Sequence, residues 1–258
     1  MPLRDGAYTD LELPTNRPTH IRNTMTIPIL RRKSRTVSLS TIGGMLSDGI
    51  ATINETIEPR AQFWDEWNKK AFEKKGPLWV ALGDSVTQGI GSSTPETSYV
   101  FIVLERLIHR SGLPWRVLNL SMSGGRFADV TTHQLPALTA TGLSADLVTS
   151  IIGSNDIMWR RNKAGIEKDA RLMLDALPRG TFLSKVSRSQ KNDRRGLINA
   201  AFSESQKSGK VHLFNAWNWP TGTGMWAEDR FHPNDGAYKL IANNLWASLL
   251  ENNDFKIQ

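Results

Sequence analysis

From residue 77 onward, apolar runs of strand length alternate with segments of helical periodicity. The apolar runs predict strands at residues 78–82, 115–120, 147–152, 181–186 and 211–214. The intervening and final segments predict helices at residues 99–111, 127–138, 163–177, 193–207 and 235–250. Because strands that alternate with helices form βαβ crossovers, this pattern predicts a parallel sheet with helices on both faces. Such a sheet binds ligands beyond the carboxyl ends of its strands, so the residues after each strand are the candidates for a site.

The first 76 residues follow a different pattern. Residues 1–44 contain four prolines and no sustained periodicity, which predicts an irregular arm. Over residues 45–72 apolar residues recur three or four positions apart, as on one face of an amphipathic helix, and Pro59 is expected to break or kink it. We therefore expect an arm and helix or helices over residues 1–76 and a main domain over residues 77–258. The helical stripe either packs on that domain or forms an aromatic cap or partner surface, built on Phe63, Trp64 and Trp67.

Three of the predicted strands are followed by residues that can attack a carbonyl group or donate a hydrogen bond to its oxygen. The first ends in Gly-Asp-Ser, and Ser85 in a tight turn could present its hydroxyl at the sheet edge. The second is followed by Gly124 and Gly125, where a main-chain N–H could approach a ligand closely. The third is followed by Asn155, whose side-chain amide is a donor of the kind that oxyanion holes use. Each feature taken alone also fits a helix cap or an ordinary turn.

The loop after the last strand carries an acid and a histidine three residues apart, Asp229 and His232. This spacing lets the carboxylate reach one imidazole nitrogen while the other nitrogen faces the cleft. Of the five histidines, His232 alone combines a strand-end loop with a nearby acid.

Composition narrows the function classes. Hydrophobic residues make up 39% and charged residues 22% of the chain, as in an ordinary globular protein. The absence of cysteine excludes disulfides, cysteine nucleophiles and thiolate metal sites. No stretch approaches the roughly 20 apolar residues of a membrane span, and the N-terminus has acids and prolines where a signal peptide would be basic and then apolar. We therefore expect a cytoplasmic protein without a transmembrane segment.

The net charge of +7 raises the question of nucleic acid. The densest basic stretches, residues 160–163 and 185–195, are not interleaved with the aromatic residues that stack on bases. We expect a solvated surface there and no nucleic-acid partner.

The segments GDSVTQG, NLSMSGG, GSND and DRFHP, in this order and spacing, resemble the four sequence blocks of the SGNH (GDSL-like) hydrolase family. The resemblance covers about residues 77–250. It implies a three-layer α/β/α, flavodoxin-like fold with a five-stranded parallel sheet in the order 2-1-3-4-5. It further implies that the protein is a serine esterase whose nucleophile is Ser85, whose general base is His232 and in which Asp229 orients that histidine. The implied oxyanion donors are the backbone N–H groups of Ser85 and Gly124, with Gly125 as a substitute for Gly124, and the side chain of Asn155. No cofactor or metal is expected.

The substrate class stays open at this point. A lipid or small ester and an acetylated carbohydrate fit the same blocks, and specificity would come from loops 86–98, 156–163 and 216–228. Four tryptophans in or beside the latter two loops could stack on a sugar, line an acyl pocket or simply pack: Trp159, Trp217, Trp219 and Trp226. An alternative from another class is a flavodoxin-like binding domain without catalysis, although Gly89-Ile90-Gly91 does not complete a phosphate-binding pattern. DNA binding is a third option.

Overall fold

The computed structural model describes residues 48–158, 162–186, 193–219, 224–252 and 255. The predicted arm at residues 1–44, the start of the predicted helix, Trp159 and parts of both basic stretches lie outside the described residues. Across the described ranges, no helix combines the length and the apolar character needed to cross a bilayer.

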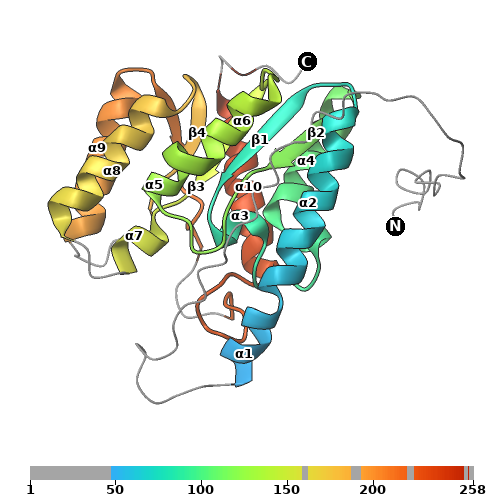
Figure 1. The fold of residues 1–258 in the computed structure, drawn as a ribbon, viewed down its shortest axis with the longest axis horizontal. Helices are drawn as coiled ribbons and strands as arrows, with labels where there is room; N and C mark the ends of the chain where they lie inside the picture. The colour runs from blue at the N-terminus through green and yellow to red at the C-terminus, as the bar shows by residue number, and fades with distance from the viewer. Residues whose placement is uncertain (1–47, 159–161, 187–192, 220–223, 253–254, 256–258) are drawn as a thin grey trace, which may run out of the picture.

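A five-stranded, all-parallel sheet forms the centre of the molecule (Figure 1). Its strands are β1 (Leu78–Gly83), β2 (Arg116–Asn119), β3 (Leu147–Ile151), β4 (Thr181–Ser184) and β5 (Val211–Phe214), in the order β2-β1-β3-β4-β5. Every residue of β1, β3 and β4 is buried, which explains why β1 is a continuous apolar run and why β3 and β4 do not alternate between apolar and charged residues. The predicted fold and strand order are confirmed.

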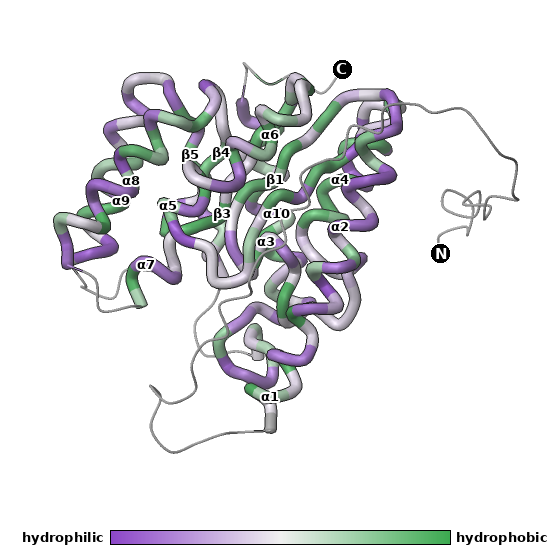
Figure 2. The backbone as a smooth tube through the Cα atoms, in the orientation of Figure 1, coloured by the Kyte–Doolittle hydropathy of each residue, from purple (hydrophilic) through white to green (hydrophobic). Residues whose placement is uncertain are grey.

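Helices cover both faces of the sheet. On one face, α4 (Tyr99–Ser111) and α10 (Asp235–Glu251) pack against each other and bury Tyr99 and Tyr238. On the other face, α6 (Leu135–Thr141), α8 (Lys163–Ala176) and α9 (Asp193–Lys207) enclose a second core. Figure 2 shows the apolar residues along the central strands, with hydrophilic residues gathered on outlying helices such as α2 and α9. The helix α4 ends at Gly112 in the left-handed conformation, as its glycine predicts.

Several short elements lie between the strands and the long helices. They are α3 (Ser85–Gln88), the 3₁₀ turn Pro95–Thr97 and α7 (Ser154–Met158). The helix predicted at residues 127–138 is instead α5 (Phe127–Asp129), a π-helical turn (Val130–Gln134) and α6 in one continuous run. The π turn is a local widening that a hydrophobic pattern does not reveal.

The first two helices of the described residues are α1 (Asp48–Glu55) and α2 (Ile57–Glu73). The helical stripe is broken into two helices as expected, but the break falls at Thr56, three residues before Pro59. Pro59 is the third residue of α2, in the first turn, where backbone N–H groups have no acceptor within the helix. A proline there removes no hydrogen bond, so the chain tolerates it.

The helix α2 lies along the outer edge of β2 and satisfies the backbone groups of this edge strand. Asn68 donates to the Asn119 carbonyl at 2.8 Å and accepts from the Asn119 amide at 2.9 Å. The indole N–H of Trp67 donates to the Val117 carbonyl at 3.2 Å. Unpaired edge groups would otherwise invite pairing with another chain. The helix is therefore part of the packed structure, not an appendage.

The aromatic residues singled out on α2 pack against the main fold. Trp64 stacks on Phe101 of α4 with ring centroids 5.3 Å apart, and Trp67 meets the same ring edge-on at 4.7 Å. Phe63 lies 5.8 Å from Phe101. Of the two interpretations of the apolar stripe, packing on the main domain accounts for these three rings.

Candidate active site

Ser85 is the first residue of α3, directly beyond the carboxyl end of β1. Asp84 caps this helix, because its side chain accepts a hydrogen bond from the Val86 amide at 3.0 Å. Gly83 has a φ of +149°, and a Cβ at this position would lie 2.4 Å from the Ile151 carbonyl oxygen. A glycine is therefore required for the chain to turn here so closely against β3.

His232 reaches Ser85 from the loop that precedes α10. Its Nε2 lies 2.9 Å from the Ser85 Oγ, and its Nδ1 lies 2.5 Å from Oδ2 of Asp229. The other carboxylate oxygen of Asp229 accepts the amides of Phe231 at 2.9 Å and of His232 at 3.0 Å. One carboxylate thus builds the turn and orients the ring. Within this turn Arg230 has a φ of +55°, an uncommon conformation for a residue with a side chain.

The ionisation of Asp229 follows from the same contacts. Burial alone would raise its pKa, but the hydrogen bond from His232 and the charge of that ring outweigh burial, so the pKa of Asp229 is lowered. The carboxylate is therefore ionised at neutral pH. An ionised partner at Nδ1 stabilises the imidazolium that forms when Nε2 takes a proton.

Besides the Ser85 amide, the candidate oxyanion donors lie in the loop after β2, which carries Gly124, and in the helix α7 after β3, which carries Asn155. Gly124 has a φ of +71°, the left-handed conformation that favours glycine. The Asn155 side chain is buried, and its Nδ2 donates to the Gly125 carbonyl at 2.9 Å. This bond joins the two loops and uses one of the two hydrogens on the amide nitrogen. The prediction did not include this contact with Gly125, which fixes the direction of the Asn155 amide.

Two supporting residues were not assigned a role from the sequence. Gln134, in the π-helical turn, forms a paired hydrogen bond with the Gly83 backbone: its Oε1 accepts from the amide and its Nε2 donates to the carbonyl, both at 2.8 Å. Asp84 is fully buried, and burial, together with the charge of Asp156, raises its pKa to about 7 although the Val86 amide opposes the rise. Neither the pairing of Gln134 with Gly83 nor the raised pKa of Asp84 can be recognised in the sequence, because both depend on contacts between distant segments.

The aromatic residues near the site differ in their exposure to solvent. Trp217 and Trp219 are buried in the core beside α10, so packing accounts for them. Trp226 is 43% exposed and meets Trp219 edge-on at 5.9 Å. Phe231 is 37% exposed, and its ring centroid lies 4.7 Å from that of His232. Trp226 and Phe231 are therefore the aromatic side chains of the His232 loop that a ligand can touch.

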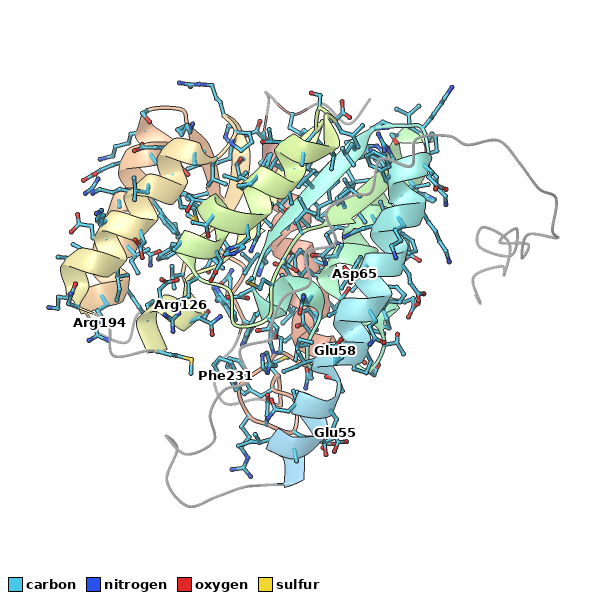
Figure 3. All side chains as sticks on the ribbon, viewed as in Figure 1. Glu55, Glu58, Asp65, Arg126, Arg194 and Phe231 are labelled. Carbon is cyan, nitrogen blue, oxygen red and sulfur yellow. The ribbon has the colours of Figure 1, made fainter. Side chains whose placement is uncertain are left out.

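Figure 3 labels several charged side chains around this region. In this view Phe231 lies between a side that carries Arg126 and Arg194 and a side, formed by α1 and α2, that carries Glu55 and Glu58. Arg126 follows Gly125 directly, and Arg194 donates to the Ile157 carbonyl of α7 at 3.3 Å.

In sum, the structure brings Ser85, His232 and Asp229 into one hydrogen-bonded line, from segments 147 residues apart. Asn155 and Gly125 join the neighbouring loops at the same edge of the sheet. An alcohol, an imidazole and a carboxylate so arranged can transfer a proton away from the hydroxyl as it attacks an electrophilic carbon.

Comparison with known proteins identifies the family and the fold. The model of the GDSL-like lipase/acylhydrolase family matches residues 81–240. The structure of TesA shares 21% identity with a TM-score of 0.56 over 67% of this chain and 97% of its own. The psychrotrophic esterase EstA from Pseudoalteromonas sp., inhibited by monoethylphosphonate, shares 18% identity with a TM-score of 0.56 over 67% of this chain and 97% of its own. At these identities the likeness shows a common fold.

A carbohydrate-active enzyme is among the similar structures. The acetyl xylan esterase Axe2 from Geobacillus stearothermophilus shares 18% identity with a TM-score of 0.50 over 69% of this chain and 96% of its own. Among curated proteins, no relative matches this chain. Since the family model covers more than half of the chain, and the predicted fold and sequence blocks agree with it, the protein belongs to the GDSL-like lipase/acylhydrolase family, the SGNH hydrolases.

Proposed function

We propose that the protein is a serine hydrolase that cleaves carboxylic esters through an acyl-enzyme intermediate, with residues 77–258 carrying the chemistry. The hydrogen-bonded line from Ser85 through His232 to Asp229 is the observation that supports this proposal most strongly. Membership of a family of lipases and acylhydrolases supports the same reaction class.

In the first half of the reaction, the Ser85 Oγ attacks the ester carbonyl carbon while Nε2 of His232 takes the hydroxyl proton. The carbonyl oxygen becomes an oxyanion, which accepts hydrogen bonds from the Ser85 and Gly124 amides and from Nδ2 of Asn155. When the intermediate collapses, the bond to the alkoxy oxygen breaks and His232 gives its proton to the leaving alcohol. The acyl group stays on Ser85.

In the second half, a water molecule replaces the alcohol. His232 takes a proton from the water as its oxygen attacks the acyl carbon, the same donors hold the second oxyanion, and the Ser85 oxygen leaves with the proton returned by His232. The product is a carboxylic acid. Asp229 stays ionised throughout and stabilises the imidazolium of His232.

As the second candidate, we propose acetyl esters of carbohydrates as the substrate. Trp226 is exposed on the same loop as Asp229 and His232, and an exposed indole is a surface on which a sugar ring can stack. Similarity to an acetyl xylan esterase points in the same direction.

A substrate panel with one active-site variant tests the proposal. Wild-type protein and Ser85→Ala would be assayed on p-nitrophenyl esters of increasing acyl length and on acetylated xylose. We expect hydrolysis by the wild type and loss of turnover in the variant, with an unchanged circular dichroism spectrum. Near-normal hydrolysis by Ser85→Ala would refute the assignment of the nucleophile. No turnover of any ester would favour a non-catalytic binding domain.

A further inference from the structure

We propose that the N-terminal helices α1 and α2, which precede the region matched by the family model, position the two loops that carry the serine and the histidine. We call residues 84–92 the nucleophile loop and residues 225–233 the base loop. The inference rests on the proposed function, since it assigns these helices a part in holding Ser85 and His232 together.

Two buried side chains of α2 donate directly to the nucleophile loop. The indole N–H of Trp64 donates to the Gln88 carbonyl at 2.9 Å, and Nη2 of Arg60 donates to the Ser92 carbonyl at 3.1 Å. Gln88 is the last residue of α3, so its carbonyl oxygen accepts no hydrogen bond from within that helix. The helix that begins with Ser85 is thus held at its far end by α2.

Arg60 occupies a position that is costly for a charged residue. Its side chain is buried, and burial lowers its pKa, while the nearby Tyr238, Glu96 and Asp235 act in the opposite direction. Burying a guanidinium is unfavourable unless its donors and charge are compensated. The bond to the Ser92 carbonyl satisfies Nη2, although Nη1 is buried without a partner among the described residues, and this bond fixes the end of the nucleophile loop to α2.

A second route connects α2 with the nucleophile loop through β2. Asn68 holds the backbone of Asn119 through two hydrogen bonds. The Asn119 side chain in turn donates from Nδ2 to the Thr87 carbonyl at 2.8 Å. The carbonyls of Thr87, Gln88 and Ser92 are therefore all held, directly or through one residue, by α2.

The base loop is contacted from α1 and the start of α2. Ile53 and Ile57 form one buried hydrophobic cluster with Ile90 of the nucleophile loop, and Ala227 of the base loop packs against it. Gly49 of α1 lies against the base loop, where an added Cβ would be 2.5 Å from the Glu228 carbonyl oxygen. Glu228 immediately precedes Asp229. The same cluster therefore touches both loops.

These contacts affect the distance between the Ser85 hydroxyl and the His232 ring, on which the proposed proton transfer depends. The 2.9 Å separation between Ser85 Oγ and His232 Nε2 joins two loops that are otherwise remote in the sequence. Misplacement by about 1 Å can cost a catalytic step about 10²-fold. A pair of helices that contacts both loops limits such displacement.

The first test compares the same substitution at two positions of α2 in the full-length protein. Trp64→Phe removes the donor to Gln88, whereas Trp67→Phe removes a donor to Val117 in β2 and leaves the route from Asn68 through Asn119 to Thr87 intact. Kinetics would be measured with p-nitrophenyl acetate. We expect kcat of Trp64→Phe to fall about tenfold, since the change is smaller than a full 1 Å misplacement, with KM little changed. Trp67→Phe should keep kcat near the wild-type value. Equal kcat values for the two variants would overturn the proposal.

The second test addresses the base loop without altering α2. Gly49→Ala forces a methyl group against Glu228, whereas Gly196→Ala places one in the helix α9, where a Cβ meets nothing within 4 Å. We expect Gly49→Ala to lower kcat and to slow the labelling of Ser85 by a fluorophosphonate probe. Gly196→Ala should do neither, and equal behaviour of the two would also count against the proposal.

Hydrogen exchange separates failure of this inference from failure of the proposed function. In Trp64→Phe, amides of residues 85–92 should exchange faster than in wild type, and in Trp67→Phe they should not. This readout needs no turnover, so it tests the helices even if the wild type hydrolyses no ester. Unchanged exchange in Trp64→Phe would overturn the positioning role.

Discussion

The buried carboxyl group of Asp84 predicts a pH-dependent stability that one substitution should remove. Burial and the charge of Asp156 raise the pKa of Asp84 from 3.8 to about 7 in the folded protein. Between these two values the unfolded chain has lost the proton while the folded chain keeps it. The folded state therefore binds more protons, and stability falls as pH rises through this window.

The magnitude follows from the size of the pKa shift. A shift from 3.8 to about 7 is about three pKa units, and each unit corresponds to about 1.4 kcal/mol, so Asp84 should cost the wild type about 4 kcal/mol at pH 8 relative to pH 4. Asp84→Asn cannot ionise, and its amide oxygen can still accept from the Val86 amide. The variant should therefore match the wild type near pH 4 and exceed it above pH 7.

Urea unfolding of both proteins at several values between pH 4 and pH 8 measures this difference. All other titrating groups are common to the two proteins, so the change in the stability difference with pH reports on Asp84. Asp146→Asn is a matched control, since its carboxylate also accepts a backbone amide, that of Leu78 at 2.7 Å, but is exposed to solvent. A stability difference between Asp84→Asn and wild type that stays constant with pH would refute the reasoning.

Three further predictions concern the neighbouring contacts. Asn155→Ala should reduce kcat about 10²- to 10³-fold in an ester assay while the thermal unfolding curve shows a folded protein, because one oxyanion donor is lost; near-normal turnover would remove Asn155 from the mechanism. Gln134→Met should lower the free energy of unfolding in urea by about 2–3 kcal/mol, because the buried Gly83 amide loses its acceptor; a change under about 0.5 kcal/mol would mean the paired bond contributes little. Burial acts to raise the pKa of Asp235, but hydrogen bonds from Ser93 and Thr97 outweigh burial and lower this pKa. The ionised Asp235 therefore stabilises the folded protein above the pKa of the unfolded chain, near 4, and this stabilisation is lost as the pH falls below that value. Asp235→Asn should therefore destabilise the protein by about 1 kcal/mol at pH 7, a figure reduced for its partial exposure, with the gap closing in acid; a gap that is constant with pH would contradict this assignment.

The sheet could be predicted from the sequence because its strands are buried on both faces. Burial leaves a continuous apolar run at residues 78–82 and a run at residues 147–152 that only Thr149 and Ser150 interrupt, and both differ from the amphipathic helices around them. Gly112 marks the end of α4 because a left-handed residue closes the helix. The site residues followed from topology, since parallel strands bring their carboxyl ends to one edge.

Other features could not be predicted because they depend on contacts between distant segments. The exact position of the break between α1 and α2, at Thr56 and not at Pro59, is one such feature, because Ile53 before the break and Ile57 after it both pack on Ile90. Short helices such as α3 have too few residues for a periodic signal. The hydrogen bond from Trp64 to Gln88 joins residues 24 apart, and no local pattern encodes it.

The role of Ser85 as the nucleophile can be measured directly by covalent labelling. Wild-type protein would be treated with a fluorophosphonate, its intact mass determined, and the modified peptide sequenced by tandem mass spectrometry. We expect one adduct per chain, located on Ser85, and a much slower reaction in His232→Ala. A wild-type protein that stays unmodified, or that carries its adduct on another residue, would contradict it.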